Sequence, residues 1–337
     1  MILNVAYILF GLAALFFGGN WLVRGASRLA ASLGVKPLVI GLTVVSFGTS
    51  VPELMVSLNA AFSGTSDIAI GNVVGSNIAN IGLILAVSGL IVMIPIHFDL
   101  IKREIPVVIV GSLLIWIMAQ NHEVNQLDGL LLVSILVVFN FFLIRASLRE
   151  RLRPTEVKEL VEEEGVVGPI NRMSELGWIV LGLVVLLVGA NRLVEGTVAV
   201  ARALQVSEVF ISLTLVAIGT SLPELVASVV AANKREGDIL FGNIIGSNIF
   251  NLFGIVGITA LVRPIAIAPR LANIEIPVMI GFALVLVVFV FRGRLPRWAS
   301  ALLLAAYFAF IVLLLADESN PTALTDLPAI FEATPVS

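Results

Sequence analysis

The hexapeptide GTSVPE at residues 48–53 recurs as GTSLPE at residues 219–224, and this repeat governs the interpretation of the whole chain. A second motif recurs at the same offset, as GNVVGSNI at residues 71–78 and GNIIGSNI at residues 242–249. Both pairs are separated by 171 residues. Chance does not produce two long matches at one constant offset. The chain is therefore expected to consist of two copies of one structural unit.

The composition excludes a soluble globular protein. Of the 337 residues, 59% are hydrophobic and only 13% are charged, and the mean hydropathy is +1.08; soluble domains carry roughly 25% charged residues. Basic residues are not gathered on an amphipathic face or interleaved with aromatic residues, so no nucleic-acid partner is expected. Cysteine is absent, which excludes disulfides, thiol catalysis and Cys-ligated zinc.

Apolar runs long enough to cross about 30 Å of hydrocarbon recur along the chain. They predict an all-α polytopic membrane protein with ten transmembrane helices in two five-helix halves, residues 1–144 and 176–316. A linker at 145–175 joins the halves, and a solvated tail follows at 317–337. No Lys or Arg precedes the first run, which is therefore expected to be a permanent span and not a cleaved signal. The expected spans are 3–22, 37–62, 68–93, 105–119, 127–144, 176–194, 209–232, 239–261, 276–291 and 298–316.

The basic residues give an independent test of this count, because Lys and Arg are retained in cytoplasmic loops. Of the 20 Lys and Arg, all but Arg192, Arg202, Arg263 and Arg270 fall in alternate loops on one side. This pattern predicts that the linker is cytoplasmic and that both termini are extracytoplasmic. Five spans is an odd number, so the second half must enter the bilayer upside down. Inverted repeats of this kind are typical of secondary transporters, whose sites lie near the midplane.

Glu53 and Glu224 lie in the middle of apolar spans, where an acidic residue costs roughly 2.5–3.5 kcal/mol. No Lys or Arg lies near the middle of an expected span, so a cation from solution is the simplest compensating partner. Pro52 and Pro223 directly precede the two carboxylates and lack the N–H group that a helix needs. Each is expected to free a carbonyl oxygen, and broken helices in transporters coordinate ions with such oxygens.

The side chains around the two carboxylates provide only oxygen ligands. Hard cations such as Ca²⁺ take six to eight oxygens, whereas imidazole or thiolate ligands indicate transition metals. His97 and His122, the only histidines, lie in expected loops. The candidate ligands beside the carboxylates are Ser46, Thr49, Ser50, Ser76 and Asn80 in the first half, and Ala217, Thr220, Ser221, Ser247 and Asn251 in the second.

Charge counting suggests coupled exchange. An empty site with two negative charges at low dielectric should resist the rearrangement that switches its access, and one Ca²⁺ or two monovalent ions would neutralise it. A carrier that moves only when neutralised exchanges ions and does not leak. Protons would satisfy the same argument, so the residues leave Na⁺ and H⁺ open as counter-ions. A passive cation channel is a further alternative, which the inverted repeat supports poorly.

The paired motifs GTSxPE and GNxxGSNIxN, in inverted five-helix halves, resemble the α-repeats of the calcium/cation antiporter superfamily, in particular its prokaryotic sodium/calcium exchanger branch. The resemblance implies a Ca²⁺ site between Glu53 and Glu224, completed by backbone oxygens of the flanking threonines. It also implies Na⁺ sites at the serine and asparagine positions and at a carbonyl one helical turn earlier.

Two departures refine this expectation. Potassium-dependent relatives carry an aspartate where this chain has Asn251, which argues against K⁺ co-transport. The proton-coupled branch carries a GNAxE signature that is absent here, although Ca²⁺/H⁺ exchange remains the alternative. The expectation is a Na⁺/Ca²⁺ antiporter of the cytoplasmic membrane, not an enzyme. It needs no cofactor, and its partners are the transported ions and the lipid bilayer.

Overall fold

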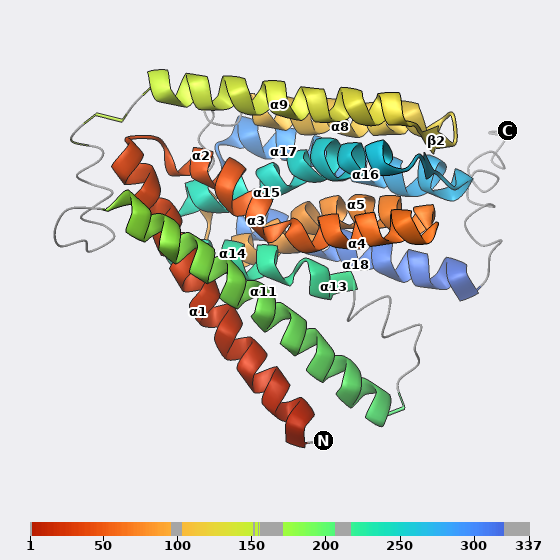
Figure 1. The fold of residues 1–337 in the computed structure, drawn as a ribbon, viewed down its shortest axis with the longest axis horizontal. Helices are drawn as coiled ribbons and strands as arrows, with labels where there is room; N and C mark the ends of the chain where they lie inside the picture. The colour runs from red at the N-terminus through yellow and green to blue at the C-terminus, as the bar shows by residue number, and fades with distance from the viewer. Residues whose placement is uncertain are drawn as a thin grey trace, which may run out of the picture.

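A computed structural model describes residues 2–95, 103–150, 152–153, 155, 171–205 and 217–319, which form an almost wholly helical bundle (Figure 1). Several helices contain π-helical turns, labelled η, and four two-residue strands lie between helices. The elements of the first half are α1 (Ile2–Leu33), α2 (Pro37–Ile40), η1 (Gly41–Val45), α3 (Ser46–Thr49), α4 (Val51–Ser63), α5 (Ser66–Ala79), η2 (Asn80–Leu85), α6 (Ala86–Ile91), β1 (Ile94–Pro95), α8 (Glu104–Ala119), β2 (Glu123–Val124) and α9 (Gln126–Arg149). Those of the second half are α11 (Arg172–Ala203), α13 (Ala217–Thr220), α14 (Leu222–Asn233), α15 (Gly237–Ile249), η4 (Phe250–Ile255), α16 (Val256–Val262), β3 (Ile265–Ala266), η5 (Leu271–Glu275), α17 (Ile276–Arg292), β4 (Arg294–Leu295) and α18 (Arg297–Ser319).

The chain is a polytopic, all-helical membrane protein. Within the described residues, seven helices are long and apolar enough to cross a bilayer, or eight if the pair α2–α3 and α4, bent by 44°, forms one span. Large apolar side chains such as those of Phe16, Phe142 and Leu302 are exposed on its outer surface, as expected where lipid replaces water. Of the other two expected spans, α8 has 16 residues, and the first eight residues of 209–232 lie outside the described part of the chain.

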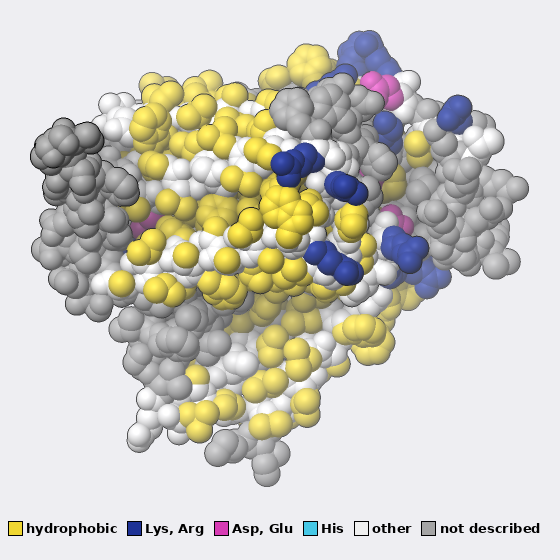
Figure 2. Space-filling model, turned by 180° about the vertical axis from the view of Figure 1, so that it is seen from behind, with side chains coloured by type: hydrophobic (Ala, Val, Ile, Leu, Met, Phe, Trp, Pro, Cys, Tyr) yellow, Lys and Arg dark blue, Asp and Glu magenta, His cyan; other side chains and the backbone are white. Residues whose placement is uncertain are grey.

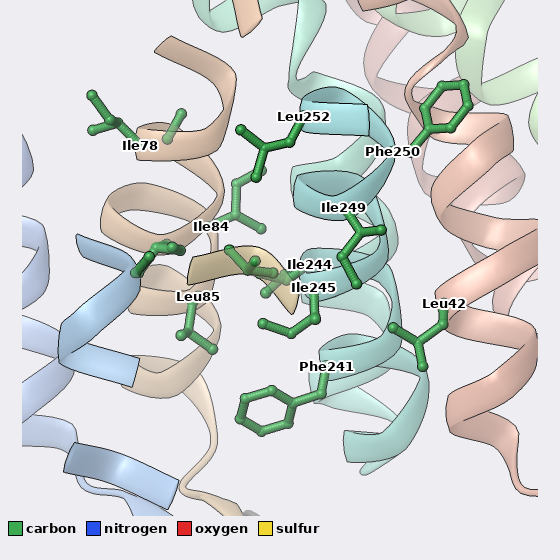
Figure 3. Packing of buried hydrophobic residues seen from close by; sticks show 14 of the residues in the cluster. Leu42, Ile78, Ile84, Leu85, Phe241, Ile244, Ile245, Ile249, Phe250 and Leu252 are labelled. Carbon is green, nitrogen blue, oxygen red and sulfur yellow. The ribbon is translucent and has the colours of Figure 1, made fainter. Parts of the chain in front are cut away.

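The helix α15 and the turn η4 lie at the centre of the bundle. Every residue of α15 from Ile239 to Ile249 is buried, and apolar side chains of η1 and η2 pack around it. Figure 3 shows Ile84 and Leu85 of η2 directed toward Ile244 and Ile245 of α15, with Leu42 of η1 on the other side. A helix that is buried all round is expected to be mostly apolar on every face, but α15 and η4 also bury four polar residues, Asn243, Ser247, Asn248 and Asn251.

The helices α1 and α11 lie side by side and cross the other helices obliquely (Figure 1). Their contact is lined by glycines at seven-residue spacing, Gly11, Gly18 and Gly25 in α1 and Gly182, Gly189 and Gly196 in α11. A Cβ atom on Gly18 would lie 2.6 Å from the backbone nitrogen of Leu186. The two backbones therefore approach as closely as in small-residue helix pairs of other membrane proteins.

Both helices are longer than expected. The spans 3–22 and 176–194 are parts of 32-residue helices, because the paired helices continue past the apolar segment and support each other there. At that end Arg28 and Glu175 form an ion pair at 3.4 Å, and both side chains are largely buried. The boundaries of the expected linker and tail also shift, because α9 extends to Arg149, α11 begins at Arg172 and α18 ends at Ser319. Residues 156–170 and 320–337 lie outside the described residues.

Two short antiparallel sheets connect the halves. β1 pairs with β4, and β2 pairs with β3. Adding 171 to the residue numbers of β1 gives those of β3, and adding 171 to those of β2 gives those of β4. The repeat therefore relates the β1–β4 sheet to the β2–β3 sheet. β3 precedes α17 and β4 follows it, so the sheets lie at opposite ends of that helix.

The glycine contact between α1 and α11 predicts that two glycines of α11 respond differently to substitution by alanine. A Cβ on Gly182 would lie 2.5 Å from the nitrogen of Leu22, whereas Gly177 has no atom within 4 Å of its Cβ position. Because overpacking costs about 1–3 kcal/mol, Gly182→Ala should lower the thermal unfolding temperature of the detergent-solubilised protein. Gly177→Ala is the control, and the higher helix propensity of alanine should leave its stability unchanged or raised. Equal melting temperatures would contradict the close approach.

Candidate ion-binding site

Glu53 and Glu224 occupy the same place in their halves, in the first turn of a helix that follows a break. α3 ends at Thr49 and α4 begins at Val51, while α13 ends at Thr220 and α14 begins at Leu222. The intervening serines have nearly identical backbone angles, φ −85° and ψ 8° at Ser50 and φ −88° and ψ 5° at Ser221. The repeated sequence thus produces the repeated helix break.

Proline explains where each break falls. Pro52 and Pro223 are in the first two residues of α4 and α14, where a helix needs no N–H donor and where proline is favoured. In the interior of an unbroken helix the same residue would remove a hydrogen bond and clash with the preceding turn. The new helix therefore starts at the proline, and its positive N-terminal end lies beside the carboxylate that follows.

The two carboxylates are bonded across the halves of the chain. The Ser50 hydroxyl donates to Oε1 of Glu224 at 2.9 Å, and the Ser221 hydroxyl lies 3.4 Å from Oε1 of Glu53. Each serine of a GTSxPE motif thus contacts the glutamate of the other motif. This reciprocal arrangement brings the two broken helices together in one site.

Both carboxylates are deeply buried, with 1% of Glu53 and 2% of Glu224 exposed. The second oxygen of each, Oε2, has no hydrogen-bond donor among the residues that the structure describes. Among the described residues, no Lys or Arg forms an ion pair with either glutamate; the ion pairs there include Arg28–Glu175 and Arg192–Glu195 at the helix ends. A buried carboxylate without a cationic partner is costly, so this site has the charge and open oxygens that a cation requires.

The helices that carry the second motif complete the surroundings. Ser76 and Asn80 lie where α5 continues into η2, and Ser247 and Asn251 lie where α15 continues into η4; all four are buried. The Asn80 amide nitrogen donates to Oδ1 of Asn248 at 3.0 Å, which leaves its own Oδ1 unpaired. Oδ1 of Asn251 and Oγ of Ser247 are unpaired as well.

The remaining candidates lie on the broken helices. Ser46 and Thr49 are buried, and the Ser46 hydroxyl donates to the carbonyl of Leu42 at 2.8 Å. Thr220 is half-buried, and Ala217 is the first residue of α13. All twelve candidates therefore lie on the two broken helices or on the two helices of the second motif. Oxygen atoms dominate the site, and no group of three His, Cys, Asp or Glu side chains occurs in the described part of the chain.

Two asparagines were not among the candidates but hold the site together. The Asn243 amide donates to the carbonyl of Glu224 at 3.3 Å and to Oγ of Ser228 at 3.0 Å, and its Oδ1 accepts from the Thr49 hydroxyl at 3.1 Å. Asn72 makes the first two bonds in the other half, to the carbonyl of Glu53 and to Oγ of Ser57, both at 3.0 Å. The signal in the sequence was that these two asparagines occupy equivalent positions in the two copies of the repeat.

The fold and this site define the class: a multi-spanning membrane protein with a buried, oxygen-lined acidic site between two broken helices. Comparison with known proteins gives the family. The sequence profile of the sodium/calcium exchanger protein family matches residues 3–145 and 174–316, and the chain therefore belongs to that family. The resemblance seen in the repeated motifs is confirmed.

The proteins that align with this chain over nearly their full length include two relatives and one solved structure. The putative antiporter CaxA of Alkalimonas amylolytica is 35% identical over 319 residues, which cover 93% of this chain and 99% of CaxA. The sodium/calcium exchanger MaX1 of Methanosarcina acetivorans is 35% identical over 343 residues, covering 92% and 98%. A structure of the sodium-calcium exchanger NCX_Mj superposes with a TM-score of 0.80 at 32% identity, covering 92% and 98%.

The bonds of Asn243 predict its contribution to stability. Asn243→Ala leaves the Ser228 hydroxyl and the Glu224 carbonyl without the amide that links them, which should cost about 1–3 kcal/mol and lower the thermal unfolding temperature. Asn140→Ala in α9 is the matched control, because the Asn140 amide makes one local bond, to the carbonyl of Leu136. Similar small decreases in unfolding temperature in both variants would show that the Asn243 bonds stabilise the protein no more than one local hydrogen bond does.

Proposed function

We propose that the protein is a secondary antiporter that exchanges Na⁺ for Ca²⁺ by alternating access. The observation that carries this proposal is the reciprocal pair of bonds, Ser50 to Glu224 and Ser221 to Glu53, which holds two buried carboxylates in one site. Membership in a family of exchangers supports ion transport without covalent chemistry. The only small molecules required are the transported ions, so no cofactor is expected.

We assign Ca²⁺ to the space between the two glutamates. Their Oε2 atoms have no donor, and two carboxylates match the charge of one divalent ion. Carbonyl oxygens near the helix breaks, including those of Thr49 and Thr220, would complete the oxygen shell that Ca²⁺ prefers. The hydroxyls of Ser50 and Ser221 hold the other carboxylate oxygens, so they orient the glutamates toward the ion.

Na⁺ is assigned to the flanking oxygens. The unpaired Oδ1 atoms of Asn80 and Asn251 and the Oγ of Ser247 are available there, with Ser76 at the equivalent position of the first half. Ser46 and Ala217 would contribute one helical turn before the threonines. Two or more Na⁺ ions drawing on these atoms and on the glutamates neutralise the same charge as one Ca²⁺, so the two cargoes exclude each other.

The choice of Na⁺ as counter-ion rests on the sequence and on the relatives. MaX1 is named a sodium/calcium exchanger, and structures of NCX_Mj were obtained after soaking with Na⁺, Ca²⁺ and Sr²⁺. Asn251 adds no third carboxylate to the site, which argues against K⁺ co-transport. Proton-coupled Ca²⁺ exchange is the other outcome that the first experiment below distinguishes.

We further propose ten membrane spans, in inverted five-helix halves with both termini outside the cytoplasmic membrane. The family profile matches two segments of similar length, separated by the linker. The exchange of one small sheet for the other under a 171-residue shift supports a two-fold relation between the halves. The alternation of Lys and Arg supports the orientation.

Flux measurements test the proposal directly. Proteoliposomes loaded with Na⁺ and diluted into Na⁺-free buffer should accumulate ⁴⁵Ca²⁺, whereas vesicles with only a pH gradient should not. Glu224→Gln should abolish uptake, because the site then holds one negative charge and no longer matches Ca²⁺. Gel filtration and thermal unfolding establish that the variant is folded. Uptake driven only by the pH gradient would make the protein a proton-coupled exchanger, and Ca²⁺ leak without counter-ion would make it a channel.

Acid should inhibit Na⁺-driven transport. Protons compete with Ca²⁺ for Glu53 and Glu224, and a protonated carboxyl group no longer offers the charge that holds the ion. Initial rates measured at saturating Na⁺ should fall steadily as both faces of the membrane are acidified to about pH 5. Raising Ca²⁺ should restore part of the rate, because the two cations compete. A flat profile over this range would contradict direct ligation by both carboxylates.

A further inference from the structure

The outer surface of the bundle carries an apolar groove of about 500 Å³ between α17 and α18. Its lining consists entirely of apolar residues and glycine, among them Val278, Gly281, Phe289, Trp298 and Leu302. Between Val278 and Phe289 the groove follows α17 for roughly 16 Å, at ~1.5 Å per residue. An elongated apolar channel of this kind matches one acyl chain better than a compact ligand.

One end of the groove is positively charged. Arg292 ends α17, and its guanidinium carbon lies 5.7 Å from the ring centroid of Trp298, which lines the groove. Arg294 follows in β4, and both arginines are exposed. Figure 2 shows Lys and Arg side chains gathered at one end of this otherwise hydrophobic face. Arg297 is engaged elsewhere, because it donates to the carbonyl of Ile91 at the end of α6.

The floor of the groove is open at Gly281, and Phe282 beside it packs against η2. A Cβ atom on Gly281 would have no neighbour within 4 Å, so this glycine leaves space that a ligand can fill. Beside it Phe282 is buried against η2, and a Cβ on Gly82 would lie 2.8 Å from the Phe282 ring. Gly82 follows the candidate ligand Asn80 by two residues. Phe282 therefore separates the groove from the segment that carries Asn80.

We propose that this groove binds one anionic phospholipid, with an acyl chain between α17 and α18 and its phosphate beside Arg292 and Arg294. Arginine pairs strongly with phosphate oxygens, and basic pockets at the cytoplasmic surface of helix bundles select anionic head groups. Lipid tails are as apolar as leucine, so the groove alone gives little preference over bulk lipid. Selectivity must then come from the arginines. The placement in the cytoplasmic leaflet rests on the orientation proposed above, whereas the binding itself does not.

Native mass spectrometry of the full-length protein in detergent tests the proposal. The protein is titrated with phosphatidylglycerol or phosphatidylcholine carrying the same acyl chains. One phosphatidylglycerol should bind more tightly than phosphatidylcholine. Arg292→Gln should weaken this binding about fivefold, the factor that corresponds to ~1 kcal/mol per basic residue. Arg149→Gln, an exposed arginine at the end of α9, is the matched control and should leave the affinity unchanged.

A second pair of variants tests the groove without changing charge. Gly281→Leu fills the open space, so the acyl chain can no longer lie in the groove and hold the head group beside the arginines, and the selective binding should be lost. Gly177→Leu, at an equally open position on α11, should leave it unchanged. Phosphatidylglycerol should also raise the unfolding temperature of the wild type and of Gly177→Leu but not of Gly281→Leu. Equal binding of the two lipids, or equal effects of the two leucines, would overturn the proposal. So would a dimer that Gly281→Leu dissociates, which would identify a second copy of the chain as the occupant.

Discussion

Two buried carboxylates with no basic partner among the described residues are the constraint on which the rest of this structure depends. Glu53 and Glu224 lie deep in a helical membrane bundle, and each keeps one oxygen without a donor. With so little of either side chain exposed, solvent screens their repulsion poorly, and an acidic residue in a membrane span is costly. The helix breaks, the serine bonds and the neighbouring amide groups form the polar surroundings of this charge.

The sequence predicted the helix breaks before the two glutamates because their cause is local. A proline fixes a helix start wherever it falls, so the breaks before Glu53 and Glu224 could be predicted without a tertiary structure. The asparagine network could not, because the bond from Thr49 to Asn243 joins residues of different halves and depends on how their helices pack. The π-helical turns η2 and η4 were not predicted from the sequence either; they begin at or directly before the candidate ligands Asn80 and Asn251, and such turns are frequent at functional sites.

The helix lengths show the same difference between features that are set locally and features that depend on tertiary packing. Hydropathy located the apolar parts of α1 and α11 but ended both helices too early, since charged residues at their ends suggested loops. In the structure these residues remain helical because the neighbouring helix supports them, as the pair Arg28–Glu175 shows. The glycines at seven-residue spacing were present in the sequence, but only the folded pair shows that they face each other.

The reciprocal serine–glutamate bonds have a consequence for how the two halves depend on each other. Ser50 belongs to the first half but orients the carboxylate of the second, and Ser221 does the reverse. Neither half alone contains both members of either serine–glutamate pair, so these contacts form only when the two halves pack together. Each motif thus imposes a requirement on the other, because a change in one serine acts on the carboxylate of the opposite half.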